Sequence, residues 1–193
     1  MKKSRTQRIE ERRQKRVRII FGLGVVAIMV LSSFAFVLNF LSPDQGSRGS
    51  FKYEIRDGMI YVNHEEREVN FYFYPDPNVY VPDEALSLIR NADIVVVAFD
   101  PNDAVNAPYI EAVRFDFSIF LDASPAAAIL SPSDEYSYPI MDCEGATPQA
   151  PYIKLVNGTG TITVNGSCVT IAGYQQQLLN LRDQFLYRYL GVV

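Results

Sequence analysis

An uninterrupted apolar segment at residues 19–41 constrains this chain more than any other feature of its sequence. The segment has 23 residues, none of them charged, and Asn39 is its one strongly polar side chain. As a helix with a rise of about 1.5 Å per residue it reaches about 34 Å, enough to cross a hydrocarbon core of about 30 Å with some tilt. The sequence therefore predicts a transmembrane helix over residues 19–41.

The charge of the chain changes sign across this segment. Residues 1–18 hold nine Lys and Arg side chains against two Glu, a net charge of +7, whereas the other 175 residues hold nine basic and twenty acidic side chains, a net charge of −11. Because Lys and Arg beside a transmembrane helix stay cytoplasmic, we expect a cytoplasmic N-terminus and a C-terminal domain outside the cell. The basic tail is expected to set this orientation, and it can also contact anionic lipid.

Two other functions of these segments are less favoured. A cleaved signal peptide would use Ser33-Phe34-Ala35 as its small-residue site, but the apolar run is longer than the usual 7 to 15 residues and continues to Leu41. We therefore expect a signal-anchor that keeps the chain in the membrane as a single-pass protein, with the lipid bilayer as its first partner. Nucleic acid is not an expected partner of the acidic part, because binding phosphate needs clustered Lys and Arg.

Beyond a Ser- and Gly-rich linker at residues 42–50, the sequence predicts one extracytoplasmic α+β domain over residues 51–193. Period-two alternation predicts a hairpin of residues 51–56 and 59–62 around the turn Asp57-Gly58. An aromatic strand is expected at 69–74 and a short helix at 82–90.

The β-branched run at 93–99 is typical of a central strand covered on both faces. A helix that starts at residue 106 or 108 and ends at 121 follows this run, and a strand is expected at 126–130. The three elements together predict a parallel βαβ unit. A loop at 131–139 precedes short strands at 140–142, 152–156 and 161–171, the last folded into a hairpin at Asn165-Gly166, and a closing helix at 174–190. We expect one mixed sheet of about six to eight strands with packed helices. The order is compatible with a thioredoxin-like topology in which Pro139 takes the place of a cis proline.

Cys143 and Cys168 are the only cysteines. In an oxidising compartment they are expected to form a disulfide, which would stabilise the domain by about 3 to 4 kcal/mol in the chain-entropy model. The alternative is a redox pair, but a catalytic dithiol normally forms a Cys-x-x-Cys motif at a helix N-terminus, which this chain lacks.

Asp100, Asn102 and Asp103 directly follow the predicted central strand, where open α/β sheets bind ligands. A calcium loop starting at Asp100 would require glycine at its sixth position, where Val105 stands. We therefore expect turn and capping residues, with a cation or ligand site as the alternative.

The single histidine, His64, lies in a predicted turn, so two-histidine metal sites and His-based triads are close to excluded. We find no nucleophile–base motif and no phosphate-binding glycine loop, and we expect no catalytic residue, metal or cofactor. Asn157-Gly-Thr159 and Asn165-Gly-Ser167 match the N-glycosylation acceptor, although Asn-Gly is also a preferred hairpin turn.

Four segments of the C-terminal half carry a resemblance to a known group. They are Pro139-Ile-Met-Asp-Cys143-Glu-Gly-Ala-Thr147, Pro151-Tyr-Ile153, Cys168-Val-Thr-Ile171 and Arg182-Asp-Gln-Phe-Leu-Tyr187-Arg-Tyr-Leu-Gly191. Together with the basic tail and anchor they resemble small uncharacterised single-pass membrane proteins of archaea. The resemblance implies that the two cysteines pair and that the helix from Arg182 to Tyr187 belongs to the core. It implies no activity.

These patterns together favour a membrane-anchored binding or assembly domain without catalytic activity. Twelve Tyr and twelve Phe residues suit an interface with a protein partner at the cell envelope. The alternatives are a membrane-tethered thiol oxidoreductase-like protein, active or degenerate, and a calcium-dependent adhesion or sensor domain.

Overall fold

The computed structural model describes residues 44–48 and 51–193, with side chains from Lys52 onward. The chain divides into two compact units, Met1–Asp44 and Gln45–Val193, and the elements below belong to the second unit, except that β1 begins at Asp44. None of the helices in the described residues is long and apolar enough to cross a membrane. The basic tail and the apolar segment at 19–41 lie outside the described residues.

A four-stranded sheet, here called the small sheet, is built from the first part of the unit. Its strands are β1 (Asp44–Arg48), β2 (Phe51–Arg56), β3 (Met59–His64) and β4 (Arg67–Phe71), in the order β1-β2-β3-β4. The predicted hairpin is confirmed, since Ile55 faces Ile60 across antiparallel strands. The aromatic strand predicted at 69–74 occupies 67–71, and part of the predicted linker forms β1.

A five-stranded sheet forms the rest of the β structure. Its strands are β5 (Ile94–Phe99), β6 (Ser124–Ile129), β7 (Tyr152–Val156), β8 (Thr161–Asn165) and β9 (Cys168–Ala172), in the order β6-β5-β7-β9-β8. The predicted parallel pairing of the strands around the first long helix is confirmed by β5 and β6, and only β8 runs antiparallel to its neighbour.

The prediction of a single mixed sheet is wrong, because the chain forms two sheets. Strands β2, β3 and β4 are joined by two-residue turns and pair with one another, whereas β5 is a buried strand that pairs on both edges with parallel strands. The strand that a thioredoxin-like order would place in the main sheet, β4, therefore lies in the small sheet. Pro139 has a trans peptide bond, and the described residues contain no cis bond.

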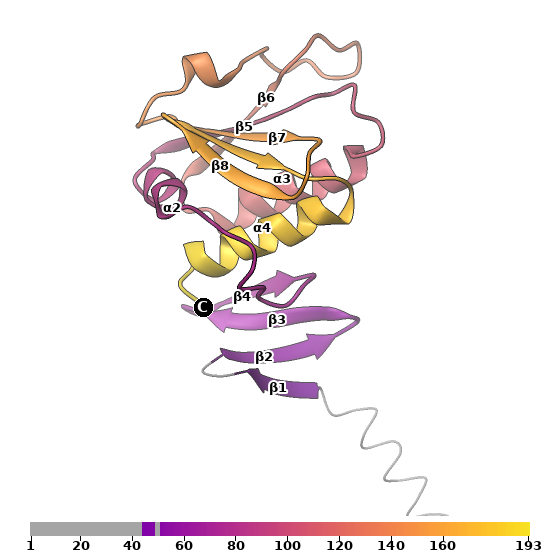
Figure 1. Cartoon of the computed structure of the whole chain (residues 1–193), viewed down its shortest axis with the longest axis vertical. Helices are drawn as coiled ribbons and strands as arrows, with labels where there is room; N and C mark the ends of the chain where they lie inside the picture. Colours follow the sequence, from indigo (N-terminus) through magenta and orange to yellow (C-terminus); the bar gives the residue numbers. More distant parts are fainter. Residues whose placement is uncertain (1–43, 49–50) are drawn as a thin grey trace, which may run out of the picture. The chain divides into compact units, whose positions relative to one another are not determined.

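Three α-helices, α2 (Asp83–Arg90), α3 (Ala107–Phe120) and α4 (Gln176–Tyr189), pack on one face of the five-stranded sheet. Helix α4 lies between that sheet and the small sheet (Figure 1). On one side the Phe71 ring of β4 stacks on Tyr187, with centroids 3.8 Å apart, and on another Phe185 meets Phe117 of α3 edge to face. Because α4 is enclosed on several sides, its buried residues include the polar side chains Arg182, Asp183 and Gln184 as well as apolar ones.

The other face of the five-stranded sheet is covered by a loop rather than by a helix. This loop contains the 3₁₀ turn η1 (Cys143–Gly145), and the Cys143–Cys168 disulfide joins it to β9, which confirms the predicted pairing. Beneath it Ala128 and Tyr152 are buried. The strand predicted at 140–142 is reduced to one bridge between Ile140 and Ile129.

Candidate functional site

The acidic residues after β5 form a turn stabilised by its own side chains. Asp100 accepts hydrogen bonds from the Asn102 backbone N–H (3.0 Å) and the Ser131 hydroxyl (2.9 Å), while Asp103 accepts one from the Asn106 side-chain amide (2.7 Å). These are the contacts of an Asx turn and a helix entry. No group of three His, Cys, Asp or Glu side chains in the described part of the chain is arranged to hold a metal ion. The cation site stays a prediction.

Of the two glycosylation sequons, only the one at Asn165 lies at a hairpin turn, because β7 and β8, on either side of Asn157, are not paired with each other. Asn157 follows β7 and Asn165 ends β8, and both side chains are exposed. Gly166, directly after Asn165, has φ +57°, so the positive φ of this hairpin turn is explained without any sugar. Glycosylation at either site stays a prediction.

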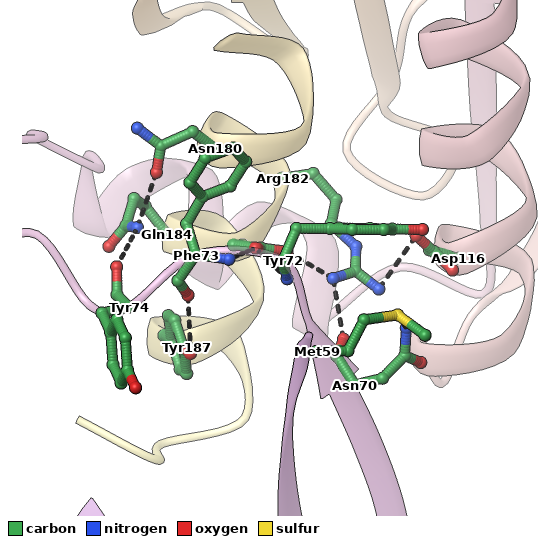
Figure 2. Close-up of polar contacts among 11 residues, drawn as sticks. Met59, Asn70, Tyr72, Phe73, Tyr74, Asp116, Asn180, Arg182, Gln184 and Tyr187 are labelled. Carbon is green, nitrogen blue, oxygen red and sulfur yellow. Dashed lines mark hydrogen bonds and ion pairs between the residues drawn. The ribbon is translucent and has the colours of Figure 1, made fainter. Parts of the chain in front are cut away.

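A buried ion cluster is centred on Arg182 of α4 (Figure 2). Its guanidinium forms ion pairs with Asp183 and with Asp116 of α3 (3.0 Å), and it donates a hydrogen bond to the backbone carbonyl of Asn70 (2.9 Å). Arg182 and Asp183 are fully buried, and Asp116 is nearly so. The Arg182 guanidinium therefore pairs with two carboxylates and also satisfies a backbone carbonyl near the end of β4.

Asp183 also fixes the segment that leaves the small sheet, residues 72–76, here called the strap. Its Oδ2 accepts hydrogen bonds from the backbone N–H groups of Tyr72 (2.7 Å) and Phe73 (2.8 Å). Burial raises the pKa of Asp183 to about 6, although Arg182 and the two N–H donors oppose the shift. Burial likewise raises the pKa of Asp116, and Arg182 again opposes the change.

Two further side chains of α4 hold the rest of the strap. Gln184 accepts from the Asp76 backbone N–H (2.7 Å) and donates to the Tyr74 carbonyl (3.0 Å), and the Tyr187 hydroxyl donates to the Phe73 carbonyl (2.9 Å). The strap has no regular secondary structure, so these side chains satisfy backbone groups that a sheet would otherwise pair. Because the cluster is closed to solvent, we assign it to holding the small sheet against α4 and not to binding a ligand.

Sequence reasoning placed this helix in the core but assigned no role to Arg182 or Asp183. The available signal was the run from Leu178 to Tyr189, in which apolar and aromatic residues fall on more than one side of the helix. A helix that is apolar on several sides is buried, and any charge within it must then be paired.

The outer side of α3 presents the most prominent apolar side chains among the regular elements. Phe115 is 65% exposed and Ile119, one turn later, is 46% exposed. Beside Phe115 a groove of about 280 Å³ runs between α3 and the edge strand β6, where Pro125 and Ala126 form part of its wall. We call the exposed side of α3 with this groove the α3 surface.

A second hollow, here called the Asp122 cleft, lies beyond the C-terminal end of α3 and has a volume of about 420 Å³. Its lining combines buried apolar and aromatic residues (Val69, Phe120 and Tyr189) with ionisable residues (His64, Glu65, Arg67, Arg90 and Asp122). His64, which the sequence places in a solvated turn, is instead the last residue of β3 and is partly buried beside this cleft.

The two arginines of the cleft have different roles. Arg90, at the end of α2, donates to the backbone carbonyls of Arg188 (2.7 Å) and Tyr189 (2.6 Å) and so caps the C-terminus of α4. Arg67 makes a loose ion pair with Asp122 (3.6 Å), and both side chains are largely exposed. Arg67 can therefore move at little energetic cost, whereas Asp122 also donates its backbone N–H to the Tyr189 hydroxyl (3.2 Å) and accepts from that hydroxyl at its Oδ2 (3.5 Å).

The turn that carries Glu65 into the cleft is strained. Glu65 and Glu66, the two central residues between β3 and β4, have φ +46° and +68°. A two-residue hairpin with positive φ at both positions normally contains Asn and Gly, and side chains such as Glu cost about 1 kcal/mol or more each in this region.

The α3 surface and the Asp122 cleft are continuous. Between them lies an open hollow whose lining includes Ile119 of the α3 surface together with Arg67, Phe120 and Asp122 of the cleft. The exposed apolar side chains of the α3 surface therefore lie next to the charged Asp122 cleft.

Comparisons with known proteins add no relative: no protein-family model, no curated protein and no solved structure matches this chain. The resemblance to archaeal membrane proteins receives no support from them.

Proposed function

We propose that this chain is a single-pass membrane protein whose acidic domain, outside the cytoplasm, binds another protein at the cell envelope. The observation that carries the proposal is the α3 surface, where Phe115 and Ile119 expose a continuous apolar ridge beside a groove. Aromatic and aliphatic side chains next to a concave surface are the usual centre of a protein interface. The domain acts in this proposal by binding and not by catalysis.

The proposed location is supported by the sequence and by the cysteines. The apolar segment at 19–41 and the basic residues before it favour an anchor with the domain outside. A disulfide between Cys143 and Cys168 suits an oxidising compartment. Cys168 is 1% exposed within β9, which favours a structural bond over the alternative of a thiol oxidoreductase.

Chemical cross-linking on intact cells that express the full chain tests the proposal. We expect a discrete adduct with one partner, and we expect it to weaken in the Phe115→Ser/Ile119→Ser variant. Tyr80→Ser is the matched control, because Tyr80 is 73% exposed but does not line the groove. Absence of a discrete adduct, or equal loss in the control, would overturn the proposal.

A further inference from the structure

We propose that the partner inserts a lysine or arginine side chain into the Asp122 cleft, an inference that rests on the proposed function. The overall charge of the domain favours a basic partner, because residues 51–193 hold 8 Lys and Arg against 19 Asp and Glu side chains. A strongly acidic surface attracts a basic partner over a distance of about one Debye length and repels an acidic one.

The backbone around the cleft adds to this preference. Helices α2, α3 and α4 end at Arg90, Phe120 and Tyr189, and all three of these residues line the cleft. Each helix C-terminus carries a partial negative charge of about half an elementary charge, and because Arg90 already caps α4, the ends of α2 and α3 are the ones that favour a further cation. The fold itself already places one guanidinium here, that of Arg90.

The lining of the cleft matches the two halves of a long basic side chain. Leu190 is partly buried and offers apolar surface to a methylene stem, while Asp122 and Glu65 offer exposed carboxylates to its charged head.

The cations already at the cleft do not prevent this binding. Arg90 is occupied by the carbonyls at the end of α4. The incoming cation would displace Arg67 from Asp122, and an exposed pair at 3.6 Å is released at a cost of at most about 1 kcal/mol. His64 Nε2 lies 4.0 Å from a carboxylate oxygen of Glu65.

The test measures binding of a fluorescent acetyl-tetralysine amide to the full-length chain by fluorescence polarisation. The variant Glu65→Gln/Asp122→Asn removes both carboxylates from the cleft without changing side-chain size. Asp134→Asn/Glu135→Gln is the matched control, because it removes the same charge from an exposed pair in the loop after β6. The basic tail is present in all three proteins and affects them alike.

We expect the cleft variant to raise Kd about tenfold, since two charge-assisted contacts are lost, and the control to raise it less than about twofold. Equal weakening in both variants, or no binding by the unmodified chain, would overturn the inference. The cross-linking experiment on intact cells distinguishes failure of this inference from failure of the proposed function. An adduct that persists in the cleft variant refutes the cleft assignment alone, whereas a missing adduct in the unmodified chain refutes the function as well.

Discussion

Replacement of Arg182 by methionine is the sharpest test of how the small sheet is held to the rest of the domain. Methionine fills a similar volume and keeps the helix, but it removes the cation shared by Asp116 and Asp183 and the donor to the Asn70 carbonyl. The substitution therefore leaves two buried carboxylates without the cation that pairs with both of them.

The structure sets the size of the effect. Removal of one partner from a buried ion pair costs about 3 to 5 kcal/mol, because the remaining charge stays buried and uncompensated. Asp183 retains its two backbone N–H donors, but Asp116 retains no comparable partner, so we expect about 4 kcal/mol. That is a large fraction of the 5 to 15 kcal/mol by which a domain is usually stable.

Arg56 of β2 provides a matched control. It also pairs with two carboxylates, Glu54 and Glu68, and lies over an aromatic ring, that of Tyr61 at 4.0 Å, but its side chain is 40% exposed. Water screens such pairs, so Arg56→Met should destabilise the domain far less than Arg182→Met does. The two variants thus differ in burial rather than in the kind of contact.

The assay is urea denaturation of the full-length chain followed by far-UV circular dichroism. If Arg182→Met is too unstable to purify, the triple variant with Asp116→Asn and Asp183→Asn removes the unpaired charges and should recover a folded protein. A loss below about 1 kcal/mol for Arg182→Met, or no recovery in the triple variant, would refute the reasoning.

Three further predictions follow from single contacts. The raised pKa of Asp183 means that the folded state holds this proton more tightly than the unfolded state, so the free energy of unfolding should fall by roughly 2 kcal/mol as the pH rises from 4 to 7. Asp183→Asn should flatten that dependence in urea titrations across this range, and an unchanged slope would contradict it. Replacing Cys143 and Cys168 together by serine should lower the free energy of unfolding by about 3.5 kcal/mol, measured in urea, whereas a change below about 1 kcal/mol would exclude a structural bond. Gly158→Ala should cost about 1 to 3 kcal/mol in the same assay, because its Cβ would lie 2.5 Å from the Cβ of Ala172, and an unchanged midpoint would contradict that contact.

Local signals in the sequence predicted most individual elements. The Asp57-Gly58 turn, the β-branched run at 93–99 and the long helix near the C-terminus all form where expected, because turn chemistry and hydrophobic periodicity act over a few residues. The pairing of Cys143 with Cys168 also followed from the sequence alone, since no other cysteine is available.

Contacts between distant residues decided the rest. The division into two sheets, the enclosure of α4 and the role of Arg182 depend on partners such as Asn70 and Asp116, which lie 112 and 66 positions away from it. The candidate site has the same origin, because Glu65, Asp122 and Tyr189 meet only when three helix ends and a hairpin turn converge. Periodicity reports which side of an element is buried but not which element covers it, so the sequence determined the elements and the tertiary structure determined the site.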